Sequence, residues 1–470
     1  MDHALADAKR QPAEPQGAAQ QRGGERLRRL LDGPIGATLA QLAAPNIAVV
    51  AVQTAVVVSD LWFVSHLGTS ALAALALVFP IQTMMGMMSA GAIGGGISSA
   101  IARSLGAGDR ERAEAVLLHA LLIALGMAAL YSLLFGFGAR PLFAAIGGKD
   151  ETLEGAVAYA RIVFGGALLI WLANTLASIL RGIGNVAVPG LMMVLTSLGG
   201  IALSGALTLG RAGLPAIGVQ GPALASVVSF GTSTLVMAIY MGSGRAGLRF
   251  RLWHVRLRAE LFFDILRVGL VACGNALLTI STIVVVTSLV GRYGTAAIAG
   301  YGLGSRLELM LIPIAFGVGA ALTAMVGTNR GAGQYARARR AAWVGGLFTF
   351  AVTGAVGITV GVAPDLWIAL YTADPTAVEH ARLYLHIAGP AYAFFGLGMA
   401  LYFASQGTGN MLWPFVAGVA RLVVAAGLGA TLALGFGASL AWLFACVAAG
   451  LVLFGGIIAL SLFGRVWRPR

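Results

Sequence analysis

The feature of this chain that most restricts its fold is a series of long apolar runs. Many of them exceed the roughly 20 residues that an α-helix needs to cross about 30 Å of hydrocarbon. The composition agrees, because 58% of the 470 residues are hydrophobic and only 10% are charged, against about 25% charged residues in an ordinary soluble domain. Strands of a membrane barrel would instead be short segments of alternating polarity. We therefore expect an all-α integral membrane protein.

Charged breaks and breaks marked by Gly or Pro divide the apolar runs into twelve predicted transmembrane helices. Their ranges are 35–67, 71–102, 114–138, 153–180, 187–209, 216–243, 260–290, 296–328, 341–363, 377–405, 412–435 and 437–463. The helices group into lobes at 35–244 and 260–464, joined by a linker over 245–259. The polar segment 1–34 is predicted to be a disordered tail, and 465–470 a short second tail.

The distribution of Lys and Arg predicts the orientation, because positive charges near helix ends are retained in the cytoplasm. One set of alternate loops and tails carries 22 of these residues, whereas the other carries only Arg140, Lys149, Arg211 and Arg292. We therefore expect both termini to be cytoplasmic, in a multi-pass protein of the cell (inner) membrane. The same asymmetry accounts for the formal charge of +13, which indicates topology and contact with membrane lipid and gives no indication of nucleic acid.

The chain also repeats itself. V-S-H-L-G-T-S-A-L-A from Val64 is similar to V-G-R-Y-G-T-A-A-I-A from Val290, and RGIGNVAVP from Arg181 is similar to QGTGNMLWP from Gln406. A third match, Gly-Ala-Gly at 106–108 and at 331–333, has nearly the same offset. Chance similarity between Gly-rich segments is the alternative, but three ordered matches at one spacing disfavour it. An even number of helices in each half makes the repeats parallel, with a cavity between them.

Several of these segments carry a resemblance to a known family. SDLWFVSHLGTSALAAL, ARSLGAGDRERA, LRGIGN with Pro189, and IGVQGPALAS resemble the MATE family, the multidrug and toxic compound extrusion antiporters, over nearly the whole chain apart from the N-terminal tail. The second half has GSRLE, TNRGAG and QGTGN. GSRLE and the spacing from Pro45 to Asp60 are more similar to the DinF-like branch than to the NorM-like branch.

The resemblance implies a V-shaped transporter of two six-helix lobes that works by alternating access. It further implies export of organic cations or other amphipathic toxic compounds in exchange for H⁺ or Na⁺. We expect a monomer whose partners are these small substrates and membrane lipid. No cofactor and no metal site are expected beyond the coupling ion.

Asp60 is the leading candidate for ion coupling. An Asp at the centre of a membrane helix costs roughly 2.5 to 3.5 kcal/mol on insertion scales, so acids within the membrane usually face a cavity and have a function. Burial favours the protonated carboxyl group, whereas oxygen donors nearby would favour Na⁺. In the resembled family the acid of the first helix couples the ion, and Asp60 matches its position. The alternative is that Asp60, near His66, lies at the external interface.

Two further residues share the predicted first helix with Asp60. Gln53 lies seven residues earlier, which is two helical turns, so it can offer an amide to the same cavity. Pro45 removes a backbone hydrogen bond and can allow the helix to bend. A polar packing contact for Gln53 and a static kink at Pro45 are equally open.

Polar residues in the fourth, fifth and sixth predicted helices could line the same cavity, namely Asn174, Ser204 and Ser226. The fifth helix departs from the resembled pattern, because DinF-like members commonly carry Asn and Asp four residues apart where this chain has Gly200 and Ser204. Asp60 therefore lacks its usual acidic companion. A single carboxylate favours a proton over Na⁺, which prefers several oxygen ligands including charged ones.

The C-terminal half offers Glu308, near the start of the eighth predicted helix, as a second ion-linked acid. The alternative is a structural ion pair between Glu308 and an arginine such as Arg267. Asn275 occupies a position where NorM-type relatives often carry an acid, which argues against a cation site of that kind. His386 can titrate near neutral pH, although an isolated His is more often a packing residue.

Other functions are disfavoured by what the chain lacks. The sequence has no H-E-x-x-H, C-x-x-C, G-x-S-x-G or G-x-x-x-x-G-K-[ST] motif, so neither an intramembrane enzyme nor an ATP-driven pump is indicated. A channel would not need a duplicated body with one buried acid. The nearest alternative is a flippase for lipid or lipid-linked oligosaccharide of the same superfamily, which often has additional helices and more cationic residues in its cavity.

Overall fold

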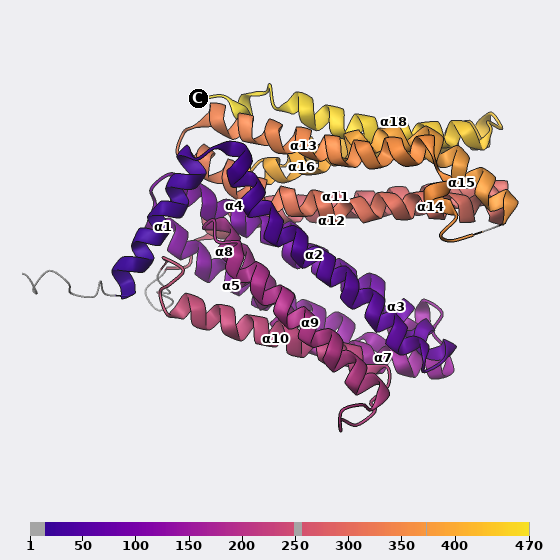
Figure 1. The fold of residues 1–470 in the computed structure, drawn as a ribbon, viewed down its shortest axis with the longest axis horizontal. Helices are drawn as coiled ribbons and strands as arrows, with labels where there is room; N and C mark the ends of the chain where they lie inside the picture. Colours follow the sequence, from indigo (N-terminus) through magenta and orange to yellow (C-terminus); the bar gives the residue numbers. More distant parts are fainter. Residues whose placement is uncertain (1–14, 249–255, 373, 470) are drawn as a thin grey trace, which may run out of the picture.

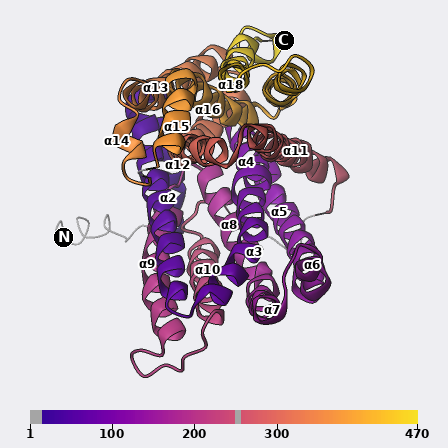
Figure 2. The same ribbon diagram turned by 90° about the vertical axis from the view of Figure 1, so that its right-hand side faces the viewer.

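The computed structural model describes residues 15–248, 256–372 and 374–469, and all regular secondary structure in these ranges is helical. Two lobes meet at one end and diverge toward the other, which gives the molecule the outline of a V (Figure 1). Figure 2 shows the lobes from the end at which they diverge. The expected fold class, a two-lobed transmembrane helical protein, is confirmed.

The N-lobe contains the helices of the first repeat. They are α2 (Ile35–Ser65), α3 (Thr69–Gly86), the π-helical segment η2 (Met87–Ala92), α4 (Ile93–Gly106), α5 (Arg110–Tyr131), η3 (Ser132–Phe137), α6 (Ala139–Ala145), α7 (Asp150–Gly165), α8 (Ala167–Gly182), α9 (Ala187–Leu209) and α10 (Gln220–Gly242).

The C-lobe contains the helices of the second repeat. They are α11 (Ala259–Val290), η4 (Gly291–Tyr293), α12 (Thr295–Gly331), α13 (Tyr335–Val362), α14 (Asp365–Ile368), α15 (Pro375–Ala388), η5 (Gly389–Ala391), α16 (Tyr392–Thr408), α17 (Leu412–Leu422), the π-helical segments η6 (Val423–Leu428) and η7 (Thr431–Gly435), α18 (Leu440–Ser461) and η8 (Arg465–Trp467).

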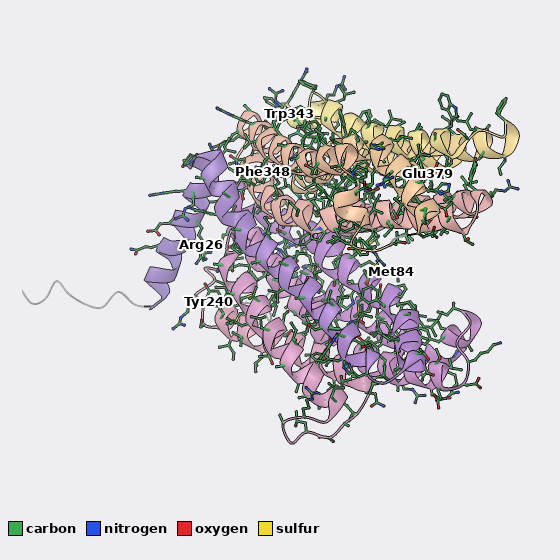
Figure 3. The ribbon with its side chains drawn as sticks, turned by 45° about the vertical axis from the view of Figure 1, so that its right-hand side comes forward. Arg26, Met84, Tyr240, Trp343, Phe348 and Glu379 are labelled. Carbon is green, nitrogen blue, oxygen red and sulfur yellow. The ribbon has the colours of Figure 1, made fainter. Side chains whose placement is uncertain are left out.

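These helices account for the predicted membrane spans. Within the described ranges, eleven helical segments are long and apolar enough to cross a membrane, and α7 with α8, bent by 46° at Gly166, can supply a twelfth. Large apolar side chains are exposed on both lobes, as Phe348 of α13 illustrates in Figure 3. A soluble protein rarely exposes so much contiguous apolar surface. These outer faces therefore suit contact with lipid.

Glycines with positive φ angles show the duplication in the backbone itself. Gly108 and Gly333 have φ angles of 76° and 74°, and Gly184 and Gly409 both have 75°. The two members of each pair are 225 positions apart. Each ends or follows a helix in the left-handed conformation that favours glycine. The short sequence matches between the halves therefore coincide with turns whose backbone admits few other residues.

The tails differ from the predicted disorder. Residues 15–32 form a helix, α1 (Pro15–Asp32), at the end where the lobes meet (Figure 1), whereas residues 1–14 lie outside the described ranges. The Leu30 carbonyl accepts a hydrogen bond from Asn329 of the C-lobe at 3.0 Å, and the Leu30 side chain packs against Gly184 of the N-lobe. At the other terminus, Trp467 is buried. The polar composition was misleading because a few apolar residues anchor each segment.

Glycines bring the two lobes into backbone contact where they meet. A Cβ atom on Gly106 of α4 would overlap the Thr328 carbonyl oxygen of α12, and one on Gly331 would overlap the Arg103 carbonyl oxygen of α4. The absence of side chains at these positions lets α4 and α12 approach closely, as small residues do between membrane helices. Main-chain atoms of the two lobes are therefore in close contact at these positions.

Charged side chains cross the same interface. Arg103 of α4 forms an ion pair with Asp264 of α11 at 2.8 Å. Arg112 of α5 bonds Glu260 at 2.7 Å and lies 3.5 Å from Asp264. Asp264 therefore pairs with arginines from two helices of the opposite lobe, and this network closes one end of the V.

The glycine contact leads to a stability prediction. We expect Gly106→Ala to lower the free energy of unfolding by about 1–3 kcal/mol, because the added methyl group overpacks the interface. Thermal unfolding of the purified protein in detergent would measure the change. The matched control is Gly126→Ala in α5, where a Cβ atom would have no neighbour within 4 Å. Equal behaviour of the two variants would contradict the proposed role of this contact.

Candidate ion-coupling site

The helices α2 and α9, which are the first and fifth membrane spans, bring Asp60 and Ser204 together inside the N-lobe. Asp60 is only 9% exposed and Ser204 only 1% exposed. The Ser204 hydroxyl donates a hydrogen bond to Oδ1 of Asp60 at 2.5 Å. Close packing of α9 on α2 makes this possible, because Gly205 leaves room for the ring of Phe63. Ser204 therefore supplies a neutral donor where the sequence lacks a second acid.

No cation of the described residues pairs with Asp60. Its hydrogen-bond partner among the described residues is the Ser204 hydroxyl, and Tyr159 of α7 interacts electrostatically with Asp60. The Tyr159 hydroxyl itself donates to Oε1 of Gln82 at 3.0 Å. A carboxyl group that is buried without a counter-charge favours its neutral, protonated form. This environment suits reversible binding of one proton.

The other N-lobe candidates do not all join this pair. Asn174 is buried but donates to the Ser89 hydroxyl at 2.9 Å, in a separate contact between α8 and η2. Gln53 and Ser226 are half-buried on α2 and α10. Pro45 lies inside the continuous helix α2 and packs against Gly190 of α9. The structure thus unites only Ser204 with Asp60 by a hydrogen bond.

In the C-lobe, Glu308 forms a buried ion pair with Arg421. The Arg421 guanidinium donates to Oε1 of Glu308 at 2.6 Å, and both side chains are less than a tenth exposed. Arg421 also stacks over the Phe395 ring at 5.4 Å. The suggested ion pair between Glu308 and Arg267 is wrong, because Arg267 lies near Asp264 on its own helix. The pair links α12 to α17 across the lobe interior.

The two remaining C-lobe candidates stand apart from this ion pair. Asn275 is buried on α11 next to Gly418 of α17, and its Oδ1 atom has no hydrogen-bond partner in the described residues. His386 is exposed on α15 and bonds the Gly361 carbonyl oxygen at 2.5 Å. Neither residue bonds Glu308.

The two halves carry different polar pairs at different places. Asp60 and Ser204 correspond in the repeat to Val286 and Gly429, which have no polar side-chain atoms. Glu308 and Arg421 correspond to the neutral residues Thr83 and Thr196. One lobe therefore holds an unpaired acid, whereas the other holds an acid that is already neutralised by an internal cation.

Three charged residues of the helices were not singled out from the sequence, namely Asp264, Arg421 and Arg181. A signal was present, because charges inside membrane spans are costly and therefore functional or paired. Arg181 is one of the 22 Lys and Arg residues assigned to the arginine-rich loops and tails, yet it lies in the last turn of α8 and is 6% exposed. Among the described residues, no group of three or more His, Cys, Asp or Glu side chains could hold a metal ion.

Solved structures with this arrangement define the class of protein. A crystal structure of MATE in complex with MaD3S superposes with a TM-score of 0.85 at 26% identity, covering 93% of this chain and 97% of that chain. An outward-facing multidrug resistance MATE family transporter superposes with a TM-score of 0.83 at 25% identity, with the same coverage. The fold is that of a two-lobed membrane transporter.

The family follows from the sequence itself. The MatE family model matches residues 45–205 and 271–431, one match in each half. The chain belongs to the MATE family of multidrug efflux transporters. It is a multi-pass membrane protein and not an enzyme.

Relatives with curated descriptions agree with this assignment. The chain is 26% identical over 384 residues to an FAD transporter of Shewanella oneidensis, covering 80% of this chain and 82% of the relative. It is also 26% identical to the probable multidrug resistance proteins YoeA of Bacillus subtilis and NorM of Thermotoga maritima. Those matches cover 74% and 80% of this chain, and 76% and 81% of the relatives.

Proposed function

We propose that this protein is a secondary antiporter that exports amphipathic toxic compounds, organic cations among them, in exchange for H⁺. The observation that carries the proposal is the buried Asp60 carboxyl, which bonds only the neutral Ser204 hydroxyl among the described residues. Protonation and deprotonation of Asp60 change the charge inside the N-lobe. The energy of that change can favour one arrangement of the lobes over the other.

A proton is favoured over Na⁺ by the ligands around Asp60. Na⁺ prefers several oxygens, and the neighbouring positions of α9 supply a glycine, Gly200, and one serine. Gln53, two helical turns before Asp60, is placed to offer a further amide to a cavity on the same face of α2. The experiment below therefore compares H⁺ coupling with Na⁺ coupling.

Orientation follows from the charge asymmetry. The end where α1 and the arginine-rich interface lie is proposed to face the cytoplasm, with both termini on that side of the inner membrane. The V then opens outward, and residues 35–244 and 260–464 act as the two moving bodies of a monomer. The GSRLE segment around Glu308 supports a DinF-like assignment within the family. A lipid-linked flippase is not favoured, because the relatives are described as FAD or multidrug transporters.

The experiment uses everted vesicles that contain the full chain and carry a preformed proton gradient. Addition of a cationic dye as the transported compound should dissipate the gradient, because each export cycle returns protons. A sodium gradient in place of the proton gradient should give no dye accumulation. Dye movement that depends on Na⁺ alone would reject proton coupling, and no response to either gradient would reject antiport.

A further inference from the structure

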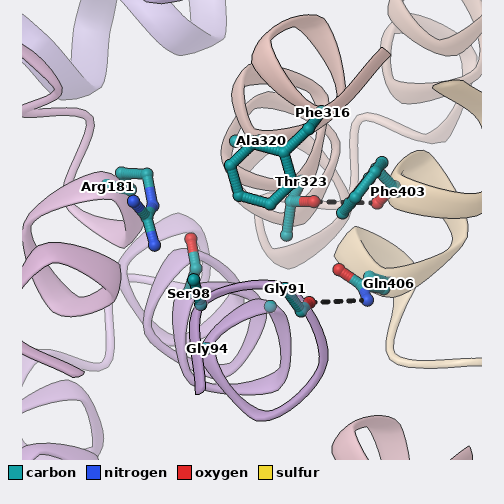
Figure 4. Close-up of a pocket in the computed structure, with 11 residues that line it drawn as sticks. Gly91, Gly94, Ser98, Arg181, Phe316, Ala320, Thr323, Phe403 and Gln406 are labelled. Carbon is teal, nitrogen blue, oxygen red and sulfur yellow. Dashed lines mark hydrogen bonds between the residues drawn. The ribbon is translucent and has the colours of Figure 1, made fainter. Parts of the chain in front are cut away.

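A small cavity lies between the lobes, at the end where they meet. Its lining includes Ser98 of α4, Thr323 of α12, Arg181 of α8 and Gln406 of α16 (Figure 4). Ser98 and Thr323 are 225 positions apart, and so are Arg181 and Gln406. The internal repeat therefore places equivalent residues around one cavity, which lies on the axis that relates the lobes.

Arg181 makes this symmetric site electrically asymmetric. The residue is only 6% exposed, and its guanidinium donates to the Ser178 hydroxyl at 2.8 Å. Among the described residues it forms no ion pair, whereas the partly buried Arg103 and the buried Arg421 each pair with a carboxylate. One neutral acceptor leaves most of the five guanidinium N–H donors unused. A buried cation without a counter-charge is costly and points to an anion that is not part of this chain.

Two of the residues that line this cavity have buried polar atoms without hydrogen-bond partners among the described residues. Ser98 is 3% exposed and Gln406 is fully buried. Neither the Ser98 hydroxyl nor Oε1 of Gln406 has a hydrogen-bond partner in the described part of the chain. The amide nitrogen of Gln406 is fixed because it donates to the Gly91 carbonyl at 3.1 Å (Figure 4). Buried polar groups are rarely left without partners. The cavity thus has the donors and the acceptor of a built polar site.

We propose that Arg181 and Ser98 bind an anionic group of the cargo, a carboxylate or a phosphate, when the lobes separate at this end. This inference rests on the proposed function and specifies that amphipaths with an acidic group are among its substrates. In the arrangement described here the cavity has only about 10 Å³ for the centres of water molecules, which is room for about one water. Separation of the lobes would place Arg181 on the wall of the opened cavity.

The chemistry of the Arg181 guanidinium and its position in the cavity support this role. A guanidinium presents several N–H donors in a plane that matches a carboxylate or phosphate, and its bonds to such groups are stronger than neutral hydrogen bonds. The equivalent residue of the other lobe, Gln406, is neutral. A bound cargo would therefore be oriented, with its acidic group toward the N-lobe.

The test compares two fluorescent probes that differ in one charge: rhodamine B, with a free carboxylate, and rhodamine B ethyl ester. Fluorescence anisotropy would give the dissociation constant of each probe for the full chain in nanodiscs, with empty nanodiscs as the blank. Arg181→Gln should weaken binding of rhodamine B about tenfold and leave the ester unchanged. Only the fraction of the protein with separated lobes binds a probe. This fraction scales the dissociation constants of both probes by the same factor, so their ratio is unaffected.

Arg211→Gln is the matched control, since it removes an exposed arginine outside the cavity. This variant should bind both probes with the affinities of the wild type. Ser98→Ala makes a smaller change in the same site and should weaken rhodamine B alone, so the proposal remains testable if Arg181→Gln fails to fold. Equal affinity of the wild type for both probes, or an equal loss for both in Arg181→Gln, overturns the proposal. Binding needs no gradient, so a carboxylate preference without antiport would reject only the proposed function.

Discussion

Asp60→Asn is expected to abolish proton-coupled export while the protein remains folded. An asparagine amide has nearly the shape of a carboxyl group and can still accept the hydrogen bond from Ser204, but it cannot bind or release a proton. Dissipation of a proton gradient on addition of dye to everted vesicles should therefore fall to the level of vesicles without the protein. The amount and unfolding temperature of the purified variant should stay near those of the wild type.

The control for this variant is Asp365→Asn, which makes the same chemical change at an exposed carboxylate. Asp365 forms an ion pair with Arg382 at 2.8 Å, and the hydrogen bonds from Arg382 lower the pKa of the Asp365 carboxyl. Such exposed pairs contribute little to stability, so transport should be unchanged. Export by Asp60→Asn at the wild-type rate would show that the coupling proton binds elsewhere.

Arg421→Gln should strongly destabilise the C-lobe, by about 3–5 kcal/mol, because it leaves the Glu308 carboxylate buried without its partner. The free energy of unfolding in detergent would measure the loss. Arg267→Gln is the matched control, since Arg267 is about half exposed and lies 3.5 Å from Asp264. Its loss should cost less than about 1 kcal/mol.

A double variant separates a structural pair from a second coupling site. Glu308→Gln combined with Arg421→Gln removes both charges, so it should be more stable than Arg421→Gln alone. Glu308→Gln should retain coupled export if the pair is structural. Loss of coupling in this variant with wild-type stability would instead identify Glu308 as a second ion-linked acid.

The lobes, the number of spans and the duplication could be predicted because they depend on local properties of the chain. Hydrocarbon demands long apolar helices, and turns with positive φ angles demand glycine, so Gly184 and Gly409 mark both repeats in the sequence. Asp60 could be singled out in the same way, since a carboxylate in an apolar segment is unusual. The break between α7 and α8 was not predicted, because Gly166 lies in a continuous apolar run.

Contacts between distant parts of the chain could not be predicted from such local properties. Glu308 and Arg421 are 113 positions apart, and nothing in either segment specifies that α12 and α17 become neighbours. The bond from Ser204 to Asp60 likewise depends on how α9 packs on α2. In both cases the residue type indicated a need for a partner, but only the packing of the helices determined which partner it received.

The docking of α1 has a consequence for the order of assembly. α1 precedes α2 in the chain, yet its Leu30 carbonyl bonds Asn329 near the end of α12, about 300 residues later. The helix can contact the N-lobe as soon as α8 is in place, through Gly184. Its second contact must wait until two-thirds of the chain has been made. Attachment of α1 to both lobes therefore requires the whole N-lobe and the first two long helices of the C-lobe.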